Sequence, residues 1–156
     1  GEISSEDYTN FFASYGVYLQ DTFAFQHGAE LLGTVVDHIA AYRVTRVQRA
    51  KLYGTLGQLL MFHGAFTAAE HALTQAHALI DAEEKPRNCT YLGQLYTLWQ
   101  RYAEGQHYLE ESRRRNAEVR LPGHQRINTV FNGVWQARLL YARSNYPGAI
   151  AAAEEV

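Results

Sequence analysis

The chain has 156 residues, a length that allows one domain and excludes a multidomain enzyme. Its 14 basic and 16 acidic residues give a net charge of −2, which argues against a dedicated nucleic-acid-binding protein, because phosphate contacts need a basic excess. The single cysteine, Cys89, excludes an internal disulfide and a multi-cysteine zinc site, and it is typical of a reducing compartment.

The N-terminal residues carry no targeting signal. Residues 1–7 are polar and acidic, the reverse of the basic and then apolar start of a signal peptide. The sequence also contains no uninterrupted run of about 18–20 apolar residues, the length that spans a bilayer. We therefore expect a cytoplasmic protein with no membrane partner.

The first 85 residues contain no proline and are rich in Ala, Leu, Gln and Glu, which predicts helix. Apolar residues recur at three- and four-residue steps over 52–63 and again over 66–80, with Gly64–Ala65 between them. This pattern predicts a helical hairpin. Strand signals are weak, since 35–36 and 44–47 are short and lie among helix formers. We expect an all-α fold.

The hairpin over residues 52–80 is one copy of an internal repeat. Copies with the same spacing of large and small residues begin 41 residues earlier, 36 residues later and a further 44 residues on. Each copy has a small residue within both helices, because two helices cross closely only where one side lacks bulk. These small residues are Gly16, Gly57, Gly93 and Ala137 on the first helix and Gly28, Ala69, Gly105 and Ala149 on the second.

The repeat resembles the tetratricopeptide repeat, whose signature is an aromatic residue, then Leu-Gly three and four residues on, and then Tyr. Leu56–Gly57 and residues 92–96 (Leu-Gly-Gln-Leu-Tyr) carry this pattern. The resemblance covers residues 9–156 and implies a right-handed α-solenoid of stacked antiparallel helical hairpins. It implies one domain over residues 1–156, with repeats at 9–42, 50–83, 86–119 and 130–156.

The spacing between the repeats predicts longer loops than the family has, because its standard period is about 34 residues. Pro86 is expected to begin the third hairpin, residues 121–123 (Leu-Pro-Gly) to break the chain before the fourth, and Pro147 to begin the last helix. The fourth repeat is truncated. The chain is therefore expected to be a fragment of a longer protein.

Motifs of enzymes are missing from the sequence. It has no Gly-x-Ser-x-Gly elbow, no phosphate-binding glycine-rich loop and no His-Glu-x-x-His, and its seven histidines include no i, i+4 pair. We expect no enzymatic activity, no metal and no cofactor. Cys89 occupies a packing position of the third repeat and is expected to be buried as a small hydrophobe.

Two groups of arginines allow more than one interpretation. Arg43, Arg46 and Arg49, followed by Lys51, would form one basic stripe on a helix, either as a solvated face or as a site for an acidic partner or a phosphate. Residues 113–115 (Arg-Arg-Arg) end a predicted helix, where they would interact favourably with the helix dipole.

The resemblance also implies a binding surface, because in the tetratricopeptide family the first helix of each hairpin lines a concave groove. A lining of amides, aliphatic groups and aromatic rings suits an extended or helical peptide. The predicted partner-binding residues are Gln58, Met61, Phe62, Thr90, Gln94, Thr97, Arg138 and Tyr141, and Val134 also lies at a lining position.

One ligand of the family is not expected here. Members that capture a chaperone's C-terminal carboxylate use Lys, Asn and Arg at lining positions. This chain has Ala13, Val17, Gln58, Thr90 and Gln94 at those positions. The sequence therefore argues against a carboxylate-clamp co-chaperone.

Two functions follow from the resemblance. The first is a protein–protein interaction scaffold that binds a peptide or a partner protein in its groove. The second is a sensor or regulatory module of a larger bacterial signalling or transcription regulator, which would bind a small ligand or a peptide. The apolar residues 149–153 lack the polar capping segment of a solenoid end, which also predicts self-association through the C-terminal helix.

Overall fold

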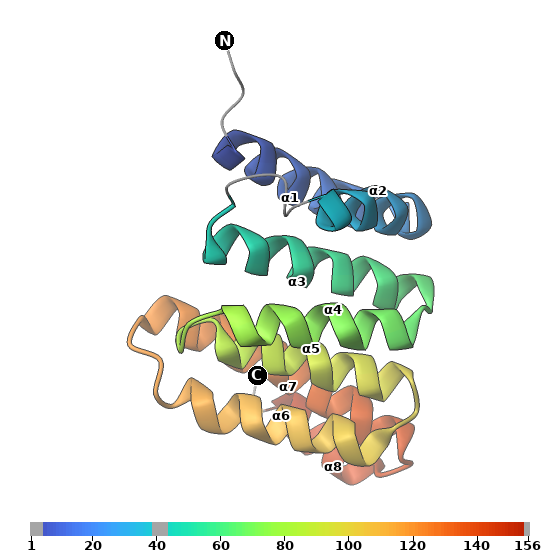
Figure 1. The fold of residues 1–156 in the computed structure, drawn as a ribbon. Helices are drawn as coiled ribbons and strands as arrows, with labels where there is room; N and C mark the ends of the chain where they lie inside the picture. Colours follow the sequence, from blue (N-terminus) through green and yellow to red (C-terminus); the bar gives the residue numbers. More distant parts are fainter. Residues whose placement is uncertain (1–4, 39–43, 155–156) are drawn as a thin grey trace. The chain divides into compact units, whose positions relative to one another are not determined.

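The computed structural model describes residues 5–38 and 44–154 (Figure 1). These residues form eight α-helices and no strands, which confirms the expected all-α class. None of these helices combines the length and the apolar character of a membrane-spanning segment. The helices are α1 (Ser5–Asp21), α2 (Phe25–His38), α3 (Arg46–His63), α4 (Phe66–Leu79), α5 (Lys85–Leu98), α6 (Tyr102–Asn116), α7 (Pro122–Ala142) and α8 (Tyr146–Glu154).

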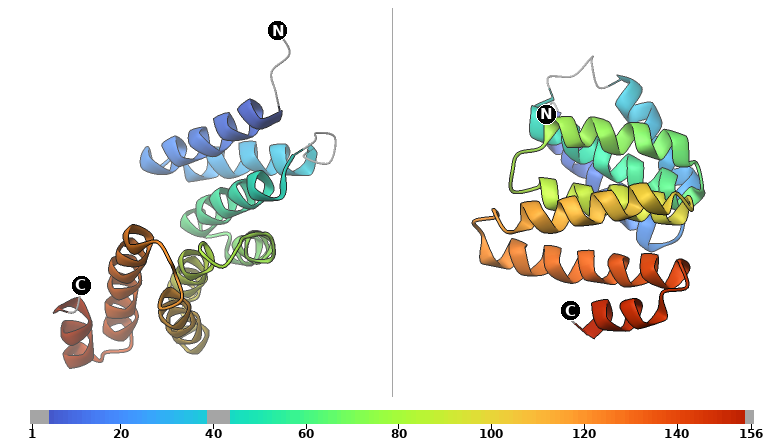
Figure 2. Two further views of the ribbon diagram at one scale, coloured as in Figure 1. Left: turned by 90° about the vertical axis from the view of Figure 1, so that its left-hand side faces the viewer. Right: turned by 90° about the horizontal axis from the view of Figure 1, so that it is seen from below.

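Consecutive helices pair within two compact units, Gly1–Ile80 and Asp81–Val156. In the first unit α1 packs against α2 and α3 against α4, and in the second α5 packs against α6 and α7 against α8 (Figure 1). Within each unit the pairs also contact each other, since α1 and α2 pack against α3, and α5 and α6 pack against α7 (Figure 2). This packing is consistent with the predicted helical hairpins.

In the first unit, the small residues lie at close helix crossings, as the repeat pattern predicts. A Cβ atom on Gly57 of α3 would lie only 2.6 Å from Cγ of Leu73 on α4. A Cβ on Gly16 of α1 would lie 2.5 Å from Cδ1 of Leu32 on α2. Both leucines are fully buried, and each fills the space that a side chain on the facing glycine would occupy.

The ends of α3 have local causes in the sequence. Thr45 caps its start, because the hydroxyl accepts from the Gln48 backbone N–H while the Gln48 side chain accepts from the Thr45 N–H. Gly64 ends the helix with a φ of 88°, a left-handed conformation that glycine adopts without a steric penalty. The predicted turn at Gly64–Ala65 is therefore confirmed.

The second unit repeats this packing. A Cβ on Gly93 of α5 would lie 2.6 Å from Cγ of Leu109 on α6, and a Cβ on Gly105 would lie 3.0 Å from Cδ1 of Leu139 on α7. Leu109, Leu139 and Trp135 form the buried core between α6 and α7. In this core, as in the first unit, each close helix contact places a glycine of one helix against a leucine of the neighbouring helix.

The prolines mark helix starts, with one difference from the sequence prediction. Pro86 lies in the first turn of α5, and Pro147 is the second residue of α8. The sequence predicts Pro122 in a break, but Pro122 is the first residue of α7, where its missing N–H breaks no helical hydrogen bond. Helix α7 therefore begins ahead of the predicted fourth repeat at residue 130.

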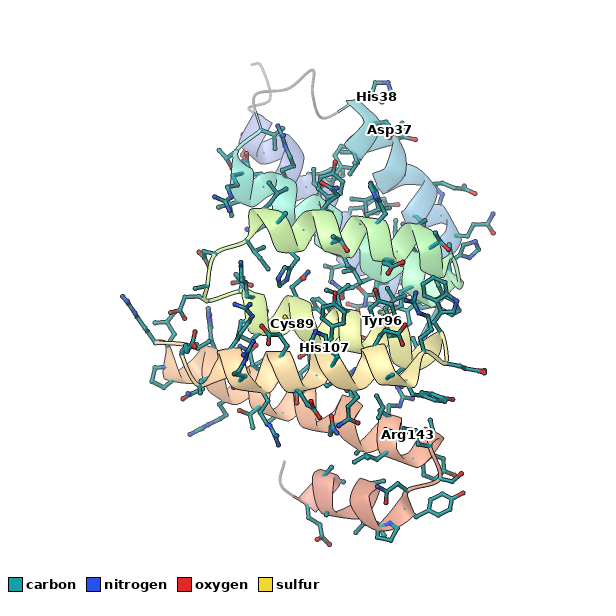
Figure 3. All side chains as sticks on the ribbon, turned by 60° about the horizontal axis from the view of Figure 1, so that its bottom comes forward. Asp37, His38, Cys89, Tyr96, His107 and Arg143 are labelled. Atoms are coloured by element: carbon teal, nitrogen blue, oxygen red, sulfur yellow. The ribbon has the colours of Figure 1, made fainter. Side chains whose placement is uncertain are left out.

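Cys89 lies on α5 and is buried, which confirms its expected packing role (Figure 3). Burial raises the pKa of the Cys89 thiol to about 11. Because only the thiolate reacts quickly with electrophiles, the thiol should be nearly inert at neutral pH.

We expect iodoacetamide at pH 8 to alkylate Cys89 roughly 100-fold more slowly in the folded chain than in urea, where the thiol regains an ordinary pKa. Mass spectrometry of samples quenched at increasing times measures both rates. Equal rates in the two conditions would show that the thiol is exposed and would contradict its buried position.

Candidate partner-binding site

The predicted groove residues of the first unit lie on the last two turns of α3. Gln58 is half-buried, and its side chain donates to the Gly54 carbonyl at 3.3 Å and accepts from Nε2 of Gln20 at 3.4 Å. Met61 is buried, whereas Phe62 is 38% exposed and its ring stacks on the ring of Phe25 at 5.3 Å. Phe62 is thus the most accessible of the three.

The predicted groove residues of α5 are covered in the structure. Thr90, Gln94 and Thr97 are all buried. Oγ1 of Thr90 lies 2.8 Å from Oγ of Ser112 on α6, and Oγ1 of Thr97 donates to the Gly93 carbonyl at 2.7 Å. The two threonine hydroxyls therefore form hydrogen bonds inside the second unit.

The predicted residues of α7, Arg138 and Tyr141, are exposed on one face of the helix. Together with three aliphatic side chains at steps of three and four residues they form a continuous surface, which we call the α7 stripe. The exposed fractions of the four apolar members are 54% for Ile127, 41% for Val130, 46% for Val134 and 66% for Tyr141.

Ile127 and Val130 were not among the predicted binding residues. The three- and four-residue spacing that links them to Val134 is visible in the sequence. Ile127 lies before the predicted fourth repeat, which begins at residue 130, although α7 begins at Pro122. Val130 is the first residue of that repeat, but the resemblance gives it no lining position. The predicted register of the fourth repeat therefore left Ile127 and Val130 out of the expected binding surface.

Arg138 is the charged member of the α7 stripe. Its guanidinium carbon lies 4.7 Å from the centroid of the Trp135 ring, a cation–π contact that holds the side chain against the helix. Helix α7 contains no Asp or Glu, and no ion pair of Arg138 occurs within residues 5–38 and 44–154. The positive charge is thus held in place beside apolar side chains without a carboxylate.

Another exposed apolar face, on α1, differs in charge. Phe11, Val17 and Tyr18 are exposed on this helix, and the rings of Phe11 and Tyr18 both stack on Tyr15. Helix α1 contains no Lys or Arg. It therefore lacks the positive charge that distinguishes the α7 stripe.

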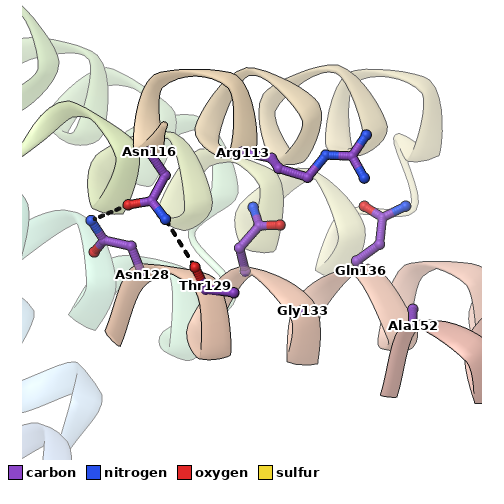
Figure 4. A pocket seen from close by; sticks show the side chains of 8 residues that line it. Arg113, Asn116, Asn128, Thr129, Gly133, Gln136 and Ala152 are labelled. Atoms are coloured by element: carbon purple, nitrogen blue, oxygen red, sulfur yellow. Dashed lines mark hydrogen bonds between the residues drawn. The ribbon is translucent and has the colours of Figure 1, made fainter. Parts of the chain in front are cut away.

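On another face of α7, asparagines replace the usual apolar contacts with α6. Nδ2 of Asn116 on α6 donates to the Gln125 carbonyl at 2.9 Å and to Oγ1 of Thr129 at 3.0 Å (Figure 4). Nδ2 of Asn128 donates to Oδ1 of Asn116 at 3.0 Å, and both asparagines are buried. This network joins the end of α6 to the first two turns of α7.

Beside this network lies a pocket of about 100 Å³. Side chains of α6, α7 and α8 line it, and Figure 4 shows the Arg113 side chain of α6 and the Gln136 side chain of α7 with their polar ends toward one another. No acidic residue lines the pocket. Its lining residues are Arg113, Asn116, Asn128, Thr129, Asn132, Gly133, Gln136 and Ala152.

The three arginines at the end of α6 have different surroundings. Arg114 and Arg115 both form ion pairs with Glu111. Burial of Glu111 opposes ionisation, but the hydrogen bonds from these two arginines outweigh it and lower the pKa of the carboxyl. The Arg113 side chain forms no hydrogen bond and no ion pair in the part of the chain that the structure describes.

The predicted basic stripe at the start of α3 is partly used inside the first unit. Nε of Arg46 donates to the Leu79 carbonyl at 2.7 Å, and its Nη2 donates to the Ala78 carbonyl at 3.2 Å. Arg46 therefore caps the C-terminus of α4, where a positive charge is favourable. Arg49 is half-buried, and Arg43 lies outside the described residues.

No group of three His, Cys, Asp or Glu side chains that could hold a metal ion occurs in the described ranges. Comparison with known proteins adds no further assignment: no family model, no curated protein and no solved structure matches the chain.

Proposed function

We propose that the chain is a protein-interaction module, a tetratricopeptide-like solenoid of helical hairpins that binds a partner along the α7 stripe. The observation that carries the proposal is the exposure of Ile127, Val130, Val134 and Tyr141 on one face of a helix whose other side is packed. Contiguous exposed apolar side chains are typical of interaction surfaces, because covering them removes apolar area from water.

The charge around the stripe favours an acidic partner. Helix α7 itself carries Arg126 and Arg138 and contains no Asp or Glu. The partner that complements this surface is a peptide segment with apolar side chains for Val134 and Tyr141 and a carboxylate for Arg138. Arg138 is already held over Trp135, so less side-chain entropy is lost when the ion pair forms.

The test is a selection of displayed peptides on the full chain, followed by affinity measurements with variants. We expect the selected peptides to contain Asp or Glu next to apolar residues. Val134→Asp should abolish their binding, and Arg138→Gln should weaken it about tenfold, the effect of losing one charged hydrogen bond.

Ile150→Ser provides the control, because Ile150 is 60% exposed, more than the 46% of Val134, but lies on α8 outside the stripe. Its affinity for the peptides should equal that of the unchanged chain. Peptides without acidic residues, or peptides that Val134→Asp still binds at full strength, would overturn the proposed site.

The second proposed function, a regulatory module that binds a small ligand, is supported by the pocket between α6, α7 and α8. The pocket and the α7 stripe share no residue. Substitutions in the pocket can therefore test ligand binding there without changing a residue of the α7 stripe.

Self-association through α8 stays a prediction. Tyr146 and Ile150 of this helix are exposed, whereas Ala149 between them is buried. Light scattering at increasing protein concentration, with Ile150→Glu as the comparison, tests it. A monomer at the highest concentration would contradict it.

A further inference from the structure

We propose that the pocket lined by α6, α7 and α8 is a binding site for one carboxylate group. It lies on a different face of α7 from the stripe, because its lining residues 128, 129, 132, 133 and 136 fall between the stripe positions on the helix. The inference rests on the second proposed function, the binding of a small ligand in this pocket, and does not depend on a partner at the α7 stripe.

The wall of the pocket is held in place before any ligand arrives. Asn116, Asn128 and Asn132 are each more than nine-tenths buried. Nδ2 of Asn132 donates to the Leu109 carbonyl at 2.9 Å, and the Asn116–Asn128 hydrogen bond fixes the adjoining wall (Figure 4). The amide side chains of the wall are therefore already ordered, and ligand binding would not lose free energy in ordering them.

The charge of the pocket selects the kind of ligand. Arg113 is the only charged residue of its lining, and no carboxylate neutralises it in the described part of the chain. A guanidinium binds a carboxylate through two parallel hydrogen bonds, and the two charges cancel. A phosphate dianion would leave one negative charge without a partner in a partly enclosed site.

Gln136 supplies the second group that can reach the ligand. Its side-chain amide forms no hydrogen bond with the described residues and points toward the polar end of Arg113 (Figure 4). A primary amide donates two hydrogen bonds, so it can bind the carboxylate oxygens together with the guanidinium.

The size of the pocket limits the rest of the ligand. The pocket has a volume of about 100 Å³. This is enough for a carboxylate on a few carbon atoms and far below the roughly 300–1,000 Å³ of sites for larger ligands. The carboxylate can belong to a free small acid or to a glutamate or aspartate side chain of a protein.

The experiment titrates the ¹⁵N-labelled full chain with three probes at constant ionic strength. The probes are acetate, glutamate blocked at both its amino and α-carboxyl groups, and inorganic phosphate. The side-chain amide signals of Asn128, Asn132 and Gln136 report binding. We expect saturable shifts with a carboxylate probe and weaker shifts with phosphate.

The variants distinguish specific binding in the pocket from a general electrostatic attraction of anions to the arginines. Arg113→Gln should weaken carboxylate binding about tenfold, which is the loss of one charge-assisted hydrogen-bond pair. Arg114→Gln is the matched control, because it removes the same charge at the neighbouring residue, whose side chain pairs with Glu111 and does not line the pocket. This variant should bind the carboxylate probes as tightly as the unchanged chain. Arg138→Gln should also bind normally, which separates this site from the α7 stripe.

Three results would overturn the proposal: shifts that do not saturate, equal weakening by Arg113→Gln and Arg114→Gln, or tighter binding of phosphate than of either carboxylate. Acetate binding as tight as that of blocked glutamate supports a free acid as the ligand. Binding of blocked glutamate alone supports a carboxylate side chain of a partner protein.

Discussion

Gly57→Ala is expected to destabilise the chain by about 1–3 kcal/mol, the usual effect of overpacking a filled core. The new Cβ would lie 2.6 Å from Cγ and 3.2 Å from the backbone nitrogen of Leu73. Leu73 is fully buried, and its backbone nitrogen can move away from the new Cβ only if α4 itself moves. Helices α3 and α4 would have to separate, and the apolar contacts between them would weaken.

The sign of this effect is what makes the measurement informative. In an exposed helix the same change stabilises by about 0.5–1 kcal/mol, because glycine loses more backbone entropy on folding than alanine. Gly33→Ala on α2 is the matched control, since no atom lies within 4 Å of its added Cβ. Urea unfolding of both variants gives the free energies, and stabilisation by Gly57→Ala would contradict the close crossing.

The second large effect is expected for Asn116→Ala, which should destabilise the chain by about 1–3 kcal/mol because the buried amide of Asn128 loses its hydrogen-bond acceptor. The variant removes the donor to the Gln125 carbonyl and to Oγ1 of Thr129. It also removes the acceptor for Nδ2 of the buried Asn128.

Gln136→Ala is the control for this network. Gln136 lines the same pocket, but its side chain forms no hydrogen bond within the described ranges, so its loss should change the unfolding free energy by about 0.5 kcal/mol or less. Thermal or urea unfolding compares the two variants. Equal free energies would show that the asparagine hydrogen bonds do not stabilise the packing of α6 on α7.

Much of the secondary structure could be predicted from local patterns. The apolar spacing over residues 52–63 and the glycine at 64 predicted the end of α3 to the residue. The start of α7 could not be predicted in this way, because Leu-Pro-Gly is equally typical of a break and of a helix start. Only the contacts of α7 with α5 and α6 show that the helix continues back to Pro122.

The candidate sites were less predictable than the helices. Asn116, Asn128 and Asn132 favour turns and caps over helix interiors, so nothing in their local sequence indicates a network. The network exists because α6 and α7 bring these residues together across 12 positions or more of sequence. The pocket beside Arg113 likewise requires three helices at once.

The clearest division lies between equivalent positions of the predicted third and fourth repeats. By itself, the sequence determined that Gln94 and Thr97 occupy the same helix face of their repeat as Arg138 and Tyr141, because helical periodicity is a local property. The tertiary structure decided that the first pair is buried and the second exposed. Burial depends on which distant segments cover a helix face, and the periodicity of that helix contains no information about them.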